Sequence, residues 1–388
     1  MAISLPVPQD IISEIIDKLG NNPDALKACA RVARSFLIPS RKKLFSAIRL
    51  TTRSARRLLF VLQRNPDISD YILDVTIVTF SLANTNLLHI LKSLDYLQHL
   101  AIELQAHKPP PIHQPLFGNL LSSPKYATLS INGTVVLPSS LINSLRVKKM
   151  RLHGVMVRNS RETEEEDVGE PSRLETLDLL VWSIPDQRLE PLRLFQNVFG
   201  LRELGIRMKW GYEKTISLGR VIITRSSRSI EHVALYYDSR SYITPDLELG
   251  LISNLRFLSF TLQYFFSETE EPDKFKFDWE STLDILNDSH VTRNLEELSL
   301  VIEFRPAGMH FEVIRGLCAW SDLDNIFVSS APKLRKLNLY VDGGSFDNLM
   351  GDEKLRIILD DKFSSLHKKG VIVSYRSCRS STLDLRRW

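Results

Sequence analysis

The sequence has few cysteines and no long apolar run. Its three cysteines, Cys29, Cys318 and Cys378, lie far apart and form no C-x-x-C pair. This spacing argues against a disulfide framework or a zinc site and fits a reducing compartment. No stretch approaches eighteen uninterrupted apolar residues, and the first residues lack a basic region followed by an apolar core. We therefore expect an intracellular protein, cytoplasmic, nuclear or both, with no membrane span and no secretory signal.

The chain also lacks the short motifs of common active sites. None of G-x-x-x-x-G-K, G-x-G-x-x-G, G-x-S-x-G and H-E-x-x-H occurs. No two carboxylates are paired in the sequence in a way that implies general acid–base catalysis. We therefore expect no catalytic residue, no cofactor and no metal ligand, in a protein that is not an enzyme.

The composition is that of a globular protein, with 43% apolar and 25% charged residues. A length of 388 residues predicts two or more domains. The net charge of +4 gives no general argument for nucleic acid binding. Basic residues nevertheless gather in the N-terminal segment, where they would suit an acidic partner.

An apolar helix is predicted near the N-terminus, over Val7–Leu19. Pro8 suits its first helical position, where a missing N–H costs nothing, and Gly20 follows where a helix commonly stops. The apolar residues that recur at helical spacing are Ile11, Ile12, Ile15, Ile16 and Leu19. A helix this apolar needs partners.

Two further short helices are predicted to follow. Asn22 can cap a helix that begins at Pro23, and a third helix lies within Ser35–Phe45. Three helices in about 40 residues are at the lower size limit for independent folding. We therefore expect another surface, that of a partner, to cover part of this segment.

The order of residues in this segment resembles an F-box. That motif begins with a Leu-Pro pair and an acidic residue, for which this chain has Val7-Pro8 and Asp10. An Ile/Leu-rich helix follows, and a Leu…Val-basic-aromatic segment ends the motif, here from Leu26 to Phe36. The next residues, 39–50, resemble the F-box proteins abundant in mushroom-forming fungi.

The resemblance implies that residues 1–50 form an F-box. An F-box docks on a Skp-family adaptor and, through it, on a cullin ubiquitin ligase. The expected adaptor contacts are Pro8, Ile11, Ile12, Ile15, Ile16, Leu26, Val32 and Phe36. Some of these residues must instead hold the three helices together, and the sequence pattern does not divide the two roles.

Beyond residue 65 a short phrase, apolar-x-x-apolar-x-apolar, recurs ten times. Most intervals run from about 21 to 29 residues, the range of leucine-rich repeats, and the final two reach about 40. The phrases are Ile72–Ile77, Leu97–Ile102, Tyr126–Ile131, Val147–Leu152, Leu174–Leu179, Leu201–Ile206, Ile230–Leu235, Leu255–Phe260, Leu295–Leu300 and Leu334–Leu339. Each predicts a strand.

Helical spacing of apolar residues appears between the phrases. It is found in the ranges 87–94, 116–121, 189–198, 283–286 and 355–359. Strand, turn and helix units of this kind stack into a solenoid, with parallel strands on the concave face and helices outside. The fold class is therefore α/β, with residues 51–388 forming an irregular leucine-rich-repeat solenoid. It is irregular because Asn and Cys, which usually follow the strand, are replaced by Phe80, Gln105, Trp182, Lys209 and Asp342, so that the polar ladder is absent.

Alternate positions of the predicted strands present polar side chains on the concave face. The candidate substrate contacts among them are Lys149, Arg151, His153, Asp178, Glu203, Arg207, His232 and Tyr236. Arg and Tyr commonly anchor protein interfaces, while any sheet that faces water also carries polar residues. We expect Lys149, Arg151 and His153 to lie beside Arg207, where they would suit an acidic or phosphorylated segment.

Together the two halves resemble F-box proteins with repeat domains. The resemblance implies a substrate-recognition subunit of a Skp–cullin–F-box ubiquitin ligase, in which the repeats hold an unknown protein substrate and other subunits catalyse. Two alternatives stay open: a leucine-rich-repeat scaffold without a ligase, and a nucleic-acid-binding solenoid, indicated by the pI of 8.8. The concave aromatic residues are too few for base stacking, which makes nucleic acid the least favoured partner.

Overall fold

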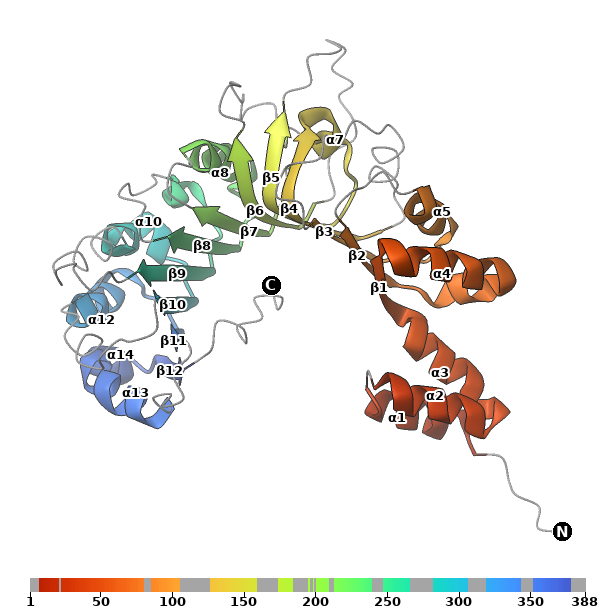
Figure 1. Ribbon diagram of the computed structural model, residues 1–388. Coiled ribbons are helices and arrows are strands. Elements are labelled where there is room, and N and C mark those ends of the chain that lie inside the picture. The colour runs from red at the N-terminus through yellow and green to blue at the C-terminus, as the bar shows by residue number, and fades with distance from the viewer. Residues whose placement is uncertain are drawn as a thin grey trace. The chain divides into compact units, whose positions relative to one another are not determined.

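A computed structural model describes residues 7–20, 22–79, 85–104, 126–158, 174–183, 195, 198, 200–208, 213–238, 247–265, 282–305, 319–342 and 352–377. The chain forms two compact units, Met1–Ser160 and Arg161–Trp388. Each unit is of the α/β type, with parallel strands and with helices along one face of them (Figure 1).

The first unit begins with three helices: α1 (Gln9–Lys18), α2 (Pro23–Val32) and α3 (Arg34–Ser46). They match the predicted helices closely. Asn22 caps α2, since its side-chain oxygen accepts the backbone N–H groups of Asp24 at 3.1 Å and Ala25 at 3.2 Å. Pro8 is the residue before α1 rather than its first helical residue, because its backbone is extended, with ψ at 144°. Gly20 ends the helical segment with a positive φ of 60°.

The three helices share a small apolar core. Ile12, Ile16 and Leu26 are buried at its centre. Around them pack four partly buried residues: Leu19, Cys29, Phe36 and Leu44. The spacing of four between Ile12 and Ile16 puts both on the inner face of α1, as helical geometry requires.

The sheet of the first unit has five parallel strands in chain order. They are β1 (Ala47–Thr51), β2 (Asp74–Thr79), β3 (His99–Leu104), β4 (Thr128–Pro138) and β5 (Lys149–Arg158). The helical connections that the structure describes are α4 (Thr52–Arg64), η1 (Pro66–Tyr71), α5 (Thr85–Ser93) and α7 (Ser139–Ser144). The expected boundary at residue 50 falls inside β1, so the helical segment ends at Ser46.

The second unit has seven parallel strands, again in chain order. They are β6 (Thr176–Ser183), β7 (Glu203–Met208), β8 (His232–Asp238), β9 (Phe257–Phe265), β10 (Glu297–Arg305), β11 (Lys336–Asp342) and β12 (Ile372–Ser377). Its helices include α8 (Glu213–Ser226), η3 (Leu249–Leu251), α10 (Ser289–Thr292), α12 (Ala319–Ser330), α13 (Asp352–Leu359), η4 (Asp360–Phe363) and α14 (Ser364–Lys368).

All ten phrases found in the sequence lie at strands, and equivalent phrase positions are paired in register. Leu100 of β3 pairs with Leu129 of β4, and Leu258 of β9 pairs with Leu298 of β10. The apolar positions are buried on the helix-covered side, because each strand alternates its side chains between two faces. This arrangement is compatible with an α/β solenoid. Two strands, β1 and β12, were not predicted.

Three of the five predicted connecting helices lie in described residues and are present. The helices expected over 87–94 and 355–359 are α5 and α13, and the helix expected over 283–286 lies within the helical residues 282–287. The segment 116–121 lies outside the described residues, as does most of 189–198. The side chains at the five positions that follow the strands also lie outside them.

Polar side chains just before β9, β10 and β11 connect neighbouring turns of the second unit. The amide nitrogen of Asn254 donates to the carbonyl of Arg228 at 2.6 Å, and that of Asn294 donates to the carbonyl of Ser253 at 2.8 Å. Lys333 donates to the side-chain oxygen of Asn294 at 2.7 Å. The two asparagine side chains therefore satisfy carbonyl groups of the preceding turns, which would otherwise need another donor.

One buried carboxylate caps the last helical turn of the second unit. Asp324 of α12 is 5% exposed and accepts the backbone N–H groups of Ser365 at 3.1 Å and Leu366 at 2.9 Å. Replacing Asp324 with Ala should lower the free energy of unfolding by about 2–4 kcal/mol, because one buried and one part-buried N–H donor lose a charged acceptor. Denaturant unfolding measures this loss. Asp322→Ala, at an exposed position of the same helix, is the matched control and should cost less than about 1 kcal/mol.

Candidate interaction surfaces

One side of α1 presents an apolar row that nothing in the described residues covers. Ile11 and Ile15 lie four residues apart on this side of the helix, and Val7 lies just before the helix begins; Val7, Ile11 and Ile15 are 50%, 43% and 40% exposed. The adjacent face of the same helix holds the buried Ile12 and Ile16. In each Ile-Ile pair of α1, one member therefore faces the helical core and the other faces solvent, because successive residues of a helix are about 100° apart.

The eight expected adaptor contacts divide accordingly. Ile12, Ile16 and Leu26 are buried within the three-helix core, and Phe36 packs against them. A partner that binds the three helices without rearranging them would contact those of the eight residues that are exposed. These are Pro8, Ile11, Ile15 and Val32.

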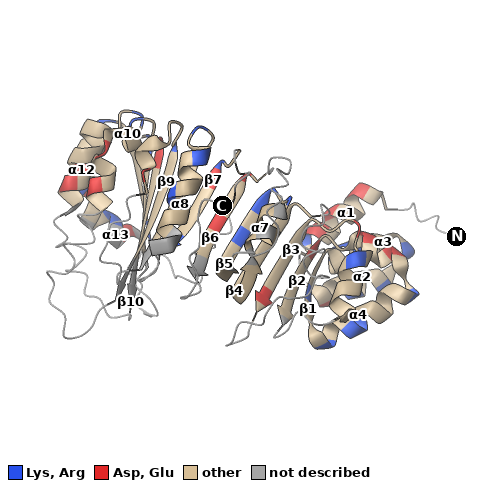
Figure 2. Cartoon of the chain, turned by 90° about the horizontal axis from the view of Figure 1, so that it is seen from above, with Lys and Arg blue, Asp and Glu red and all other residues tan. Residues whose placement is uncertain are grey.

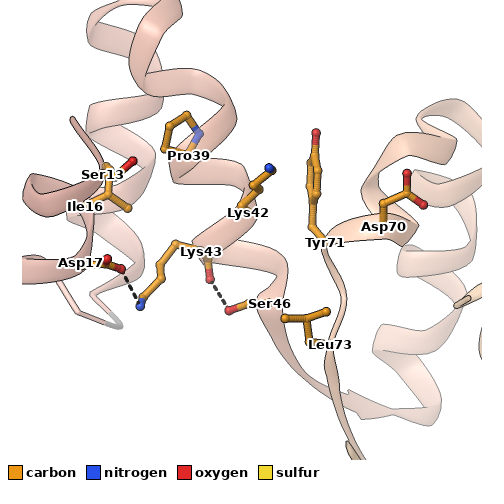
Figure 3. A pocket seen from close by; sticks show the side chains of 10 residues that line it. All are labelled: Ser13, Ile16, Asp17, Pro39, Lys42, Lys43, Ser46, Asp70, Tyr71 and Leu73. Atoms are coloured by element: carbon orange, nitrogen blue, oxygen red, sulfur yellow. Dashed lines mark hydrogen bonds and ion pairs between the residues drawn. The ribbon is translucent and has the colours of Figure 1, made fainter. Parts of the chain in front are cut away.

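A groove of ≈ 440 Å³ lies between α1, α3 and η1 (Figure 3). Its lining residues are Ser13, Ile16, Asp17, Pro39, Lys42, Lys43, Ser46, Asp70, Tyr71 and Leu73. Lys43 pairs with Asp17 at 3.2 Å, and the Lys42 ammonium lies 5.9 Å from the centre of the Tyr71 ring. This groove was not predictable from the sequence pattern, because one of its walls is the 3₁₀ segment Pro66–Tyr71, which folds back beside α3.

On the first unit, three of the expected substrate contacts follow one another along β5. Lys149, Arg151 and His153 occupy alternate positions on the face away from the buried Met150 and Leu152. Figure 2 shows basic residues, in blue, along this strand. They therefore form one basic row.

The acidic side chains of this face on the neighbouring strands lie near basic residues. Arg49 of β1 contacts Glu103 of β3 at 2.6 Å, and His99 lies 3.7 Å from Asp74. The acidic side chains of β2 and β3 thus have basic neighbours within their own part of the sheet.

The other five expected contacts lie on the second unit, on β6, β7 and β8. The guanidinium of Arg207 lies 4.5 Å from the centre of the Tyr236 ring, its register partner. Glu203 accepts a hydrogen bond from Thr176 at 2.9 Å. Asp178 lies next to the β7 position Gly205, which has no side chain of its own there. Arg207 thus belongs to a different unit from the basic row of β5, so the expected cluster does not form within one unit.

His232 stacks on Phe257 of the neighbouring strand, with ring centroids 4.1 Å apart. Burial lowers the pKa of His232 below its usual value, an effect that outweighs the nearby carboxylates of Glu203 and Glu231, which raise it. The imidazole is therefore held in its neutral form.

This shift makes the stability of the second unit depend on pH. Because the folded pKa lies below the unfolded value of about 6.5, protons bind the unfolded chain first as the pH falls. The free energy of unfolding should therefore decrease as the pH falls from about 7.5 to about 5.5, a range centred on the ordinary histidine pKa of about 6.5. In His232→Gln the decrease should be smaller. Urea unfolding across this range measures the difference, with His89→Gln on α5 as the comparison.

A ladder of alternating charge runs along the edge at which β6 to β11 begin. The residue just before each strand is, in order, Glu175, Arg202, Glu231, Arg256, Glu296 and Arg335. Arg256 donates to Glu296 at 2.8 and 3.0 Å and lies 3.9 Å from Glu231. The hydrogen bond from Arg256 lowers the pKa of the Glu296 carboxyl.

Sequence analysis missed this ladder, although its charges alternate in the sequence, at the residue after the first apolar position in each of the last six phrases. The same residues hold the backbone in place: the carbonyl of Arg202 accepts N–H groups from Glu231 at 2.9 Å and His232 at 3.0 Å. Like charges at neighbouring rungs would repel, so the alternation favours the observed order of strands.

In the part of the chain that the structure describes, no group of three or more His, Cys, Asp or Glu residues could hold a metal ion. None of the described helices is both long enough and apolar enough to cross a membrane. The chain matches no model of a known protein family. It also matches no curated protein.

Proposed function

We propose that this chain is the substrate-recognition subunit of a Skp–cullin–F-box ubiquitin ligase. In this proposal α1, α2 and α3 form the F-box that docks on a Skp-family adaptor. The strands after them belong to an irregular leucine-rich-repeat solenoid that holds a protein substrate. Other subunits of the ligase catalyse the reaction, and this chain holds the substrate close to them.

The observation that carries the proposal is the exposed apolar row of Val7, Ile11 and Ile15. The three-helix segment already has its own core, so this row is not needed to hold the helices together. Apolar side chains aligned on one helix face suit a partner groove, because burying them removes apolar surface from water. The order of residues that resembles an F-box favours the adaptor as that partner.

The polar faces of the strands support the second half of the proposal. Arg207 and Tyr236 stack on one of these faces, and a basic row lies on another. Side chains of these types anchor protein interfaces because they bury area and still make polar contacts. The paired charge ladder at the strand edge contributes to the scaffold rather than to binding.

Co-elution tests the first half of the proposal. The full-length chain and a purified Skp-family adaptor should leave a size-exclusion column as one complex of equal stoichiometry. The scaffold alternative predicts separate elution of two folded proteins. The nucleic-acid alternative predicts instead that RNA or DNA binds with an affinity that falls steeply with added salt.

A further inference from the structure

Three basic residues of β5 each have a neutral hydrogen-bonding residue beside them on β4. The register pairs are Thr128 with Lys149, Ser130 with Arg151, and Asn132 with His153. All six lie on the face away from the helices, because the residues between them are buried: Leu129, Ile131, Met150 and Leu152. Lys149 and Asn132 are exposed, and the other four are half-buried.

The spacing of these pairs suits a row of oxyanions. Neighbouring strands lie about 4.8 Å apart, so one carboxylate or phosphoryl group can contact both members of a pair. Successive pairs lie about 6.6 Å apart along the strands, which is also the distance between alternate side chains of an extended peptide. An extended segment with an acidic residue at every second position would therefore match all three pairs.

The charge of this surface also suits an acidic segment. Neither Thr128–Pro138 nor Lys149–Arg158 contains an Asp or a Glu. On β3, the next strand, Glu103 is already paired with Arg49 at 2.6 Å. The two strands together therefore present no acidic side chain on this face, and they carry basic residues beside neutral residues that can donate hydrogen bonds.

We propose that the outward face of β4 and β5 binds an extended acidic segment of a protein, with side-chain oxyanions at every second residue. The oxyanion is a carboxylate or a phosphorylated side chain, which the pairs would hold in the same way. This inference rests on the proposed function for the identity of the segment as substrate.

Fluorescence anisotropy with the full chain tests the proposal. A labelled peptide that alternates Glu and Ser should bind about tenfold more tightly than a peptide of the same composition with its Glu residues consecutive. An alternating phosphoserine peptide distinguishes the two sources of oxyanion. Binding of either alternating peptide in preference to the consecutive one supports the proposal.

A pair of double variants tests the residues. Lys149→Glu/Arg151→Glu should weaken binding of the alternating peptide by more than about tenfold, because two attractions become repulsions. Lys92→Glu/Arg146→Glu makes the same change in net charge at exposed positions off this face. This control should bind as the parent does.

Three results would overturn the proposal. They are equal binding of the alternating and consecutive peptides, equal losses in the two double variants, and tighter, more salt-sensitive binding of a single-stranded oligonucleotide than of any acidic peptide. Adaptor binding is measured separately with the same variants. A chain that binds the alternating peptide but no adaptor refutes the proposed ligase function and leaves this site in place.

Discussion

Replacing Ile15 with Asp is expected to weaken adaptor binding by at least about a hundredfold while leaving the three helices folded. In the free chain this side chain is 40% exposed, so a carboxylate there stays hydrated. In the proposed complex it would enter an apolar interface, where an unpaired charge costs several kcal/mol, and about 2.7 kcal/mol suffices for a hundredfold change. Titration calorimetry with the purified adaptor measures the affinity.

Two companion variants separate docking from folding. Tyr96→Asp alters another exposed large side chain of the same unit, outside the three helices, and should bind the adaptor normally. Ile12→Asp puts the charge into the helical core and should unfold α1, α2 and α3, with loss of helical signal in circular dichroism. Parent-like adaptor affinity in Ile15→Asp would show that the exposed row of α1 is not the docking surface.

Replacing Gly133 with Ala is expected to lower the free energy of unfolding of the first unit by about 2–4 kcal/mol. Gly133 has a φ of +121°, a conformation that residues with a side chain rarely adopt. A Cβ there would lie 2.8 Å from the Cβ of Leu104 and closer still to the Leu104 carbonyl oxygen. The site lies where the register of β4 and β5 shifts between Asn132 and Val135, and the clash would be with Leu104 at the end of β3.

The matched control for this substitution is Gly200→Ala. A Cβ at Gly200 would have no atom within 4 Å, and its φ is not positive. Its replacement should be neutral or slightly stabilising, because Ala lowers the entropy of the unfolded chain. Differential scanning fluorimetry should show a melting temperature at least about 5 °C lower for Gly133→Ala only. Equal melting of the two variants would contradict the strained geometry.

The strands were predictable because the apolar phrase repeats. Equivalent residues of successive phrases are paired, as Leu204 is with Val233, so an alignment of the phrases matches the pairing of neighbouring strands. The two strands that were not predicted, β1 and β12, depart from the phrase. Phe45, Ile48 and Leu50 fit the phrase at β1, but Phe45 also belongs to α3. At β12 the first apolar position is taken by Gly370, which turns with a φ of +82°.

The division of roles on α1 was not predictable from the sequence. Ile11, Ile12, Ile15 and Ile16 are chemically alike and cover two adjacent faces of a helix. Which pair is buried depends on where α2 and α3 pack, and Leu26 and Phe36 settle it by closing over Ile12 and Ile16. The groove beside α1 was hidden for the same reason, since it joins residues from segments that are distant in the chain.

The polar surfaces were only partly predictable. Alternation along each strand identified the outward residues, but which of them are neighbours depends on register across strands. The pairs of β4 and β5 and the charge ladder before β6 to β11 both become apparent only when strands are aligned. The expected neighbourhood of Arg207 and the basic row of β5 joins residues of two compact units, and it stays a prediction.

The most direct test of the account is adaptor binding by the full chain and by a chain that lacks residues 1–46. This truncation removes α1, α2 and α3 but keeps β1, whose pairing with β2 belongs to the sheet. The account predicts that the full chain binds a Skp-family adaptor with equal stoichiometry and that the truncated, still folded chain does not bind it. Failure of the folded full chain to bind any adaptor of this family, or undiminished binding after truncation, would contradict it.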